Sequence, residues 1–72
     1  MDWKQIEGKW DTVKGKFKEK WGKLTDDDLM QIKGKKEVLT GKLKSSYGYH
    51  KDEAEKQVDE FRKNLDKDIN PQ

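Results

Sequence analysis

The fold is decided by residues 2–27, DWKQIEGKWDTVKGKFKEKWGKLTDD, which residues 28–53, DLMQIKGKKEVLTGKLKSSYGYHKDE, nearly repeat without a gap. Ten of the 26 aligned positions are identical, and five further pairs keep their chemistry, among them Val13/Leu39 and Trp21/Tyr47. Such a repeat indicates one structural unit used twice, each copy too small to bury its apolar face alone. It suggests two α-hairpins and says almost nothing about activity.

The composition describes a small, highly charged chain with few aliphatic residues. Of its 72 residues, 13 are Leu, Ile, Val or Phe and 32 are charged, and the net charge is +2. A domain of this length buries only about 60% of its unfolded surface, so the Trp and Tyr residues must supply part of the core. The chain has no Cys to form a disulfide or a thiolate metal site. We expect one domain over residues 1–68 and a frayed tail at 69–72.

Long apolar runs are missing from the sequence. The N-terminal residues Met1–Lys4 lack the apolar stretch of a signal peptide. No segment approaches the ~18 apolar residues of a membrane span. We therefore expect a cytoplasmic protein.

Apolar residues recur at steps of three and four, which is the spacing of one face of an α-helix. They predict helices over residues 3–21 and 51–66. Residues 26–47 are predicted to form two helices, 26–33 and 35–47, because Gly34 favours a break, but one continuous helix stays an alternative. Most of the core is expected to come from Trp3, Ile6, Trp10, Val13, Phe17, Trp21, Leu29, Ile32, Leu39, Leu43, Val58 and Phe61.

The expected helix ends carry residues suited to them. Gly22 and Gly48 each follow an aromatic residue at the end of an apolar stripe, where a left-handed C′ position favours glycine. Thr25 precedes the three carboxylates of residues 26–28. It therefore offers an N-cap oxygen, and the carboxylates offer negative charge, to the positive end of the next helix.

Glycines recur every seven residues within the predicted helices. Each interior glycine destabilises a helix by about 1 kcal/mol relative to alanine, so Gly8, Gly15, Gly34 and Gly41 together cost about 4 kcal/mol. Two explanations compete for these glycines. Another backbone packs closely on their face, or the chain is kept weakly helical so that it can unfold and refold.

Charge is unevenly distributed along the chain. Residues 1–24 carry +3, 25–28 carry −3, 29–51 carry +5 and 52–72 carry −3. The simplest explanation is internal: the acidic last helix lies near the basic helix over 35–47.

The sequence shows no catalytic constellation, and we expect neither an enzyme nor a cofactor. His50 follows a helix end and is expected in an exposed loop, and Ser45 and Ser46 lack partners for a triad. The acidic run at 26–28 lacks the alternating ligands and distal Glu of a calcium loop, so we interpret it as a helix cap and expect no metal site. The Gly-Lys pairs lack the spacing of a phosphate loop.

Lysines beside glycines form a row that gives a candidate anion-binding surface. A phosphate backbone or an anionic membrane would be attracted to it without sequence specificity. Interspersed acids such as Glu7 and Glu19 favour the simpler interpretation of a solvated face. Likewise, the aromatic stripe is better explained as core than as a base-stacking platform. The candidate lysines are Lys9, Lys16, Lys23, Lys35 and Lys42.

Several motifs together resemble the CsbD-like family of small bacterial stress proteins, of the YjbJ type. They are the block at residues 20–28, KWGKLTDDD, the Tyr47-Gly48-Tyr49 block, and KDEAE at residues 51–55. The resemblance covers residues 3–58. It is weaker in the last helix, where family members carry another Trp and this chain has Phe61.

The resemblance implies a fold and a physiological setting. The implied fold is all-α, with four helices arranged as two α-hairpins that cross at a steep angle, similar to SAM domains. The implied setting is general stress, with no assigned reaction and no catalytic residues to carry over. We expect a monomeric, non-enzymatic stress-response protein that acts by abundance or through a protein partner. The alternative is weak, sequence-independent binding of nucleic acid or anionic membrane, and no small-molecule substrate is expected.

Overall fold

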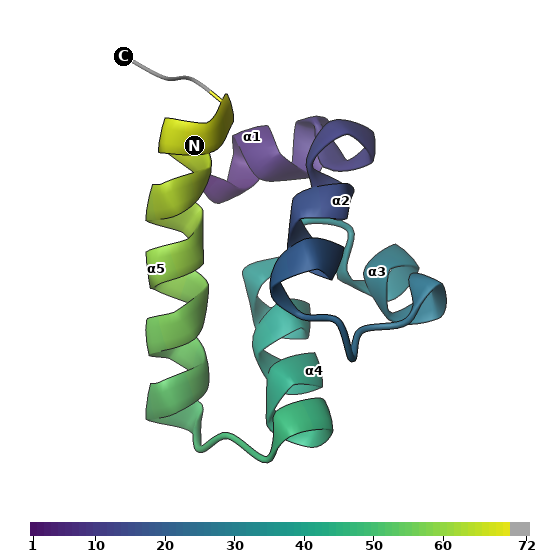
Figure 1. Ribbon diagram of the computed structural model, residues 1–72, viewed down its shortest axis with the longest axis vertical. Helices are drawn as coiled ribbons and strands as arrows, with labels where there is room; N and C mark the ends of the chain where they lie inside the picture. Colours follow the sequence, from purple (N-terminus) through teal and green to yellow (C-terminus); the bar gives the residue numbers. More distant parts are fainter. Residues whose placement is uncertain (70–72) are drawn as a thin grey trace.

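The computed structural model describes the backbone of residues 1–69 and the side chains of residues 1–65. Within this part of the chain all regular structure is helical, which confirms the all-α prediction. In Figure 1, α4 and α5 lie side by side and run antiparallel, and α3 lies on the side of the molecule away from α5. The steep crossing of two hairpins stays a prediction. The helices are α1 (Trp3–Gly8), α2 (Trp10–Lys20), α3 (Asp26–Ile32), α4 (Lys36–Tyr47) and α5 (Lys51–Ile69).

The helix expected over residues 3–21 is two helices, α1 and α2, joined at Lys9. Lys9 leaves the helical conformation, with φ −112° and ψ 27°. Its N–H donates to the carbonyls of Gln5 and Glu7, which ends α1. Its own carbonyl accepts from Thr12 and Val13, which begins α2. The apolar spacing did not reveal this bend because Ile6 and Trp10, on either side of it, are both buried in the core.

Residues 26–47 form two helices, α3 and α4, and not the alternative of one continuous helix. A sharp turn joins them. Lys33 and Gly34 both take positive φ, at 46° and 84°. Gly34 is buried against α1, because a Cβ at this position would lie 2.7 Å from the Cα of Glu7. Close backbone packing therefore explains one of the four interior glycines. At Gly8, Gly15 and Gly41 a Cβ would meet nothing within 4 Å, so packing does not explain them.

The helix ends agree with the predictions at Thr25 and Gly48 and differ at Gly22. The Thr25 hydroxyl and the Asp28 carboxylate form a reciprocal capping box at the start of α3. Gly48 ends α4 with φ 70°. The C-cap of α2 is Trp21, and Gly22 has no positive φ. There the ammonium of Lys18 donates to the carbonyls of Leu24 and Gly22, and this side chain holds the loop instead.

The last helix continues beyond the predicted residue 66. Its backbone is helical to Ile69, the first residue of the predicted tail. Residues 70–72 of that tail lie outside the described residues. At the opposite end of the chain, the carbonyl of Met1 accepts a hydrogen bond from the Arg62 guanidinium at 3.2 Å. The N-terminus is thus held against α5.

One hydrophobic core connects all five helices. Eleven of the twelve predicted core residues are buried, and Trp3 is half-buried at its edge. Four further residues are buried: Met1, Leu24, Ala54 and Leu65. At the centre, the Phe61 ring lies 4.6 Å from Phe17 and 4.8 Å from Trp21 between centroids. Phe61 thus supplies the aromatic contact between α5 and α2, and the aromatic stripe is core.

The acidic last helix lies against the basic α4, as the charge distribution predicted. The two helices pack along each other, as Figure 1 shows. Lys36 of α4 forms an ion pair with Asp59 of α5 at 3.3 Å. Both side chains are partly exposed to solvent, so this pair adds only a modest stabilisation.

We predict that Gly15→Ala and Gly41→Ala each stabilise the protein by about 1 kcal/mol. Both glycines lie inside helices with ordinary backbone angles, and the space beside each is open. The added methyl group therefore restricts the unfolded chain without a clash. Urea unfolding followed by circular dichroism measures the change. A lower midpoint in either variant would contradict the open geometry.

Candidate functional site

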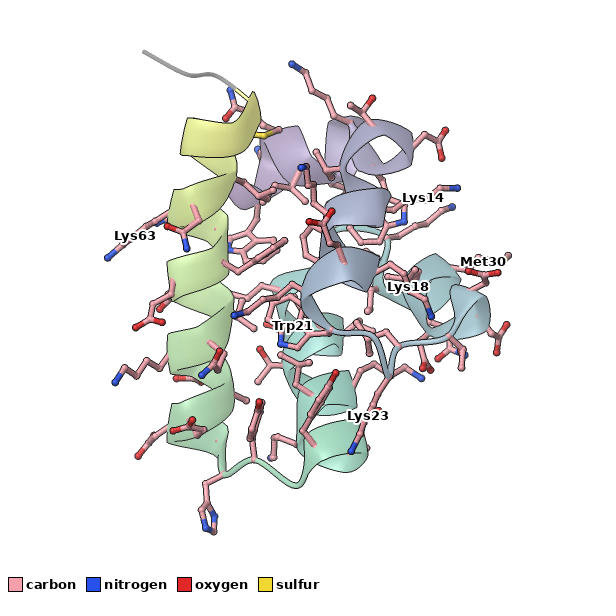
Figure 2. The ribbon with its side chains drawn as sticks, viewed as in Figure 1. Lys14, Lys18, Trp21, Lys23, Met30 and Lys63 are labelled. Atoms are coloured by element: carbon pink, nitrogen blue, oxygen red, sulfur yellow. The ribbon has the colours of Figure 1, made fainter. Side chains whose placement is uncertain are left out.

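A groove between α2 and α3 is a surface feature that the core does not explain. In Figure 2, Lys14 and Lys18 of α2 and Met30 of α3 lie on the side of the molecule away from α5. Met30 is 70% exposed and is the one large apolar side chain exposed within residues 1–65. This surface, the first groove, is lined by Trp10, Asp11, Lys14, Gly15, Lys18, Asp26, Leu29, Met30 and Lys33.

The walls of the first groove are held by contacts already described. The capping box of Thr25 and Asp28 fixes the start of α3. The Lys18 ammonium fixes the loop between α2 and α3. Trp10 and Leu29 lie beneath the surface, at 8% and 5% exposure. Gly15 leaves the α2 backbone uncovered, with open space where a side chain would stand.

A second groove between α4 and α5 provides an internal comparison. It is lined by Lys36, Glu37, Thr40, Gly41, Lys44, Lys51 and Glu55. Six of these seven residues stand 26 positions after a residue that lines the first groove. The glycine is retained, but the counterpart of Trp10 is Lys36 and that of Leu29 is Glu55. The residue 26 positions after Met30 is Lys56, which is exposed. Helix pairing alone therefore does not require an apolar side chain at position 30.

The rim of the first groove is weakly basic. Three lysines and two aspartates line it, which leaves one net positive charge. Asp11 already lies 3.9 Å from the Lys14 ammonium. Asp26 belongs to the first turn of α3, where its charge faces the positive end of the helix. The Lys18 ammonium donates to two backbone carbonyls, and because these carry no full charge they do not neutralise it.

The five lysines predicted from the sequence lie on several elements. Lys9 lies between α1 and α2, Lys16 on α2, and Lys35 at the start of α4. The Lys23 ammonium lies 5.0 Å above the Tyr47 ring. The Lys42 ammonium pairs with Asp28 at 3.3 Å. Anion binding by this set stays a prediction.

Sequence reasoning missed the lysines that line the first groove. It selected lysines that directly follow glycines, whereas Lys14, Lys18 and Lys33 line the groove. Lys14 precedes Gly15, and Lys33 precedes Gly34. The only signal for a special surface was Met30, an apolar residue outside the helical stripe. That signal is weak, because single exposed apolar residues are common.

The acidic run at residues 26–28 acts as a helix start, as interpreted. The Asp28 N–H donates to the Thr25 hydroxyl at 3.1 Å, and the Thr25 N–H donates to the Asp28 carboxylate at 3.0 Å. No group of three or more potential metal ligands is found among the described residues. None of the helices in that part of the chain has the length and hydropathy needed to span a membrane.

We predict that Asp28 makes the stability of the protein depend on pH in the acid range. The backbone N–H of Thr25, helped by the Lys42 ammonium, holds the pKa of the Asp28 carboxyl below its ordinary value of 3.8. A lowered folded-state pKa gives stability that is present above the unfolded pKa and is lost as the pH falls through the folded pKa. Asp28→Asn should therefore be less stable than the native chain at pH 7, and the difference should shrink in strong acid.

Urea midpoints of the native and Asp28→Asn chains across that pH range measure the effect. Asp27→Asn is the matched control, because Asp27 lies in the same first turn without the capping contact. A difference for Asp28→Asn that stays constant with pH would contradict the role of its charge.

The protein is thus a small all-α domain with grooves between its helices. Comparisons with known proteins give its family. A family model described as CsbD-like matches residues 4–56. The chain belongs to the CsbD-like family. No solved structure matches it significantly.

The relatives are small proteins that match along most of their length. A UPF0337 protein of Rhodopirellula baltica is 72% identical over 61 residues, covering 85% of this chain and 90% of that protein. One from Bradyrhizobium diazoefficiens is 66% identical over 65 residues, covering 90% of this chain and 98% of that protein. The UPF0337 protein YjbJ of Escherichia coli is 52% identical over 59 residues, covering 82% of this chain and 86% of that protein. The family-level resemblance of the sequence is thereby confirmed.

Proposed function

We propose that the protein is a non-enzymatic general stress-response protein of the cytoplasm that acts through a protein partner bound in the first groove. The observation that carries the proposal is Met30, which is 70% exposed in a groove also lined by three lysines, whereas the residue 26 positions later, beside the second groove, is Lys56. Concave surfaces lined partly by apolar side chains are common binding sites, and Met30 lines this one. The resemblance to small bacterial stress proteins supports the physiological setting.

The chemistry of the surface supports binding over catalysis. A general base or nucleophile works within a pocket that excludes water and orients the substrate. The side chains that line the first groove are apolar, Lys or Asp, and include neither His nor Ser. His50, the single histidine of the chain, is exposed at the start of α5.

The test is survival of a bacterial host that lacks its own CsbD-like gene. The host is given the native chain, Met30→Gln or Lys56→Gln, and is exposed to osmotic, heat and stationary-phase stress. We expect protection by the native chain and by Lys56→Gln, and loss of protection with Met30→Gln at equal protein level. Both variants place glutamine on an exposed site, so stability should change little. Protection by Met30→Gln, or no protection by the native chain under any stress, would contradict the proposal.

The alternative function is binding of nucleic acid or anionic membrane. The salt dependence of binding distinguishes it from the binding of a protein partner. Contacts to phosphate weaken steeply as the salt concentration rises. Titration of duplex DNA and of phosphatidylglycerol vesicles at low salt measures such binding. Strong, salt-sensitive binding that is unchanged by Met30→Gln would favour the alternative over a protein partner.

A further inference from the structure

We propose that the first groove binds an amphipathic helix whose apolar stripe is flanked by acidic side chains. This inference rests on the proposed function, because it names the chemistry of the partner. The occupant is a helix of another protein, with apolar residues at helical spacing over Met30 and Gly15. Its carboxylates meet Lys14, Lys18 and Lys33.

The shape of the first groove suits a helix. Its two walls are helices, α2 and α3. On the α2 wall, Gly15 has no positive φ, and a Cβ added there would have no neighbour within 4 Å. Glycine is unfavourable in a helix interior, and nothing within the described part of this chain requires it at position 15. An uncovered backbone allows a partner to approach closely.

The apolar part of the first groove supplies the central contact. Met30 projects to solvent, as Figure 2 shows, and is 70% exposed. A methionine side chain is unbranched and polarizable, so it adapts well to the apolar face of a bound helix. Helices that bind in grooves present apolar anchors at positions i, i+3, i+4 and i+7. The second groove retains the glycine as Gly41, and its other lining residues are Lys, Glu and Thr, so it serves as the internal control.

The charge around Met30 favours an acidic partner. Lys14, Lys18 and Lys33 outnumber Asp11 and Asp26, and Asp11 lies beside the Lys14 ammonium. Complementary charge raises the association rate and selects among apolar helices. A nucleic acid would use the lysines but not Met30.

A second copy of this chain fits the first groove poorly. The first groove of that copy would bring the same excess of lysines against this one. The exposed residues of its long acidic helix, α5, include no apolar side chain within 51–65. They are Lys51, Asp52, Glu53, Lys56, Glu60, Lys63 and Asn64.

The test is selection from a displayed library of amphipathic helices. Each helix carries an apolar stripe, and the positions that flank it vary among Glu, Gln and Lys. Selection on the whole chain should enrich Glu at the flanking positions. Synthetic peptides with the selected sequences should bind the protein more weakly as the salt concentration rises. Met30→Gln should weaken their binding by about tenfold or more.

Two glycine variants distinguish a loss of binding from a loss of folding. Gly15→Gln fills the first groove and Gly41→Gln fills the second, and glutamine raises helix propensity in both. We expect both to melt at or above the native temperature, with the binding of the selected helices lost only in Gly15→Gln. Equal binding by both variants would overturn the proposal, as would enrichment of Lys or Gln at the flanking positions or no enrichment.

The outcomes separate this inference from the proposed function. If Met30→Gln abolishes stress protection but the library yields lysine-flanked helices, the function stands and the acidic partner is wrong. If acidic helices are selected but Met30→Gln still protects, the groove binds helices and the proposed function is wrong. Binding of phosphatidylglycerol vesicles that depends on Met30, with no helix enriched, would assign the groove to a membrane surface and overturn the inference.

Discussion

Phe17→Ala should destabilise the protein by about 3–5 kcal/mol and strongly lower its melting temperature. Phe17 is fully buried, and its ring centroid lies 4.8 Å from Trp10 and 4.6 Å from Phe61. The substitution therefore leaves a cavity where α2 meets α5. A chain of this length has a total stability of about 4–11 kcal/mol, so the loss is comparable with the whole.

Thermal melting followed by circular dichroism measures this loss. Trp3→Ala is the control, because Trp3 also belongs to the apolar stripe but is only half-buried. It should melt cooperatively and closer to the native temperature. A cooperative Phe17→Ala transition near the native midpoint would contradict the assignment of Phe17 to the centre of the core.

Gly34→Ala should destabilise the protein by about 3 kcal/mol, because two penalties act together. The backbone at Gly34 has φ 84°, which strains any residue with a Cβ. The new Cβ would also lie 2.7 Å from the Cα and 2.8 Å from the N of Glu7. Because these Glu7 atoms belong to the backbone, they cannot rotate out of the way as a side chain could. In the variant, α1 must therefore move away from the turn between α3 and α4.

Gly48→Ala separates the two penalties. Gly48 has a similar φ of 70°, but a Cβ there would meet nothing within 4 Å. Urea unfolding should show a loss of about 1–2 kcal/mol for Gly48→Ala from backbone strain alone. The loss should be clearly larger for Gly34→Ala. Equal losses in the two variants would contradict the close contact with α1.

Local signals in the sequence predicted the parts of the fold that depend on neighbouring residues. Apolar spacing identified the buried face of each helix, and Thr25 with Asp28 identified the start of α3. The break at Gly34 was predicted because glycine is unfavourable inside a helix. Each of these features involves residues a few positions apart, so periodicity and capping rules describe them.

Features that depend on distant residues, or on a side chain that reaches into a loop, could not be predicted in the same way. Leu24 is buried from a loop and Met1 from the chain end, where no periodicity applies. Gly22 carried the same C-cap signal as Gly48, but the Lys18 side chain reaches across the loop and replaces the left-handed turn. Of four similar glycines, only Gly34 meets another backbone, and its partner Glu7 lies 27 positions earlier in the sequence.

The first groove was also beyond sequence reasoning. Its lining combines α2 and α3 residues that are more than ten positions apart, such as Lys14 and Met30. The comparison between position 30 and position 56 depends on which residues line each groove, and it extends beyond the repeat over residues 2–53.

The most direct test of the first groove is stress protection in cells by Gly15→Gln beside Gly41→Gln. Both variants place the same side chain at an open helical glycine, one in each groove. We predict that both chains accumulate as folded protein, that Gly41→Gln protects the host as the native chain does, and that Gly15→Gln does not. Full protection by Gly15→Gln would contradict a function through the groove between α2 and α3.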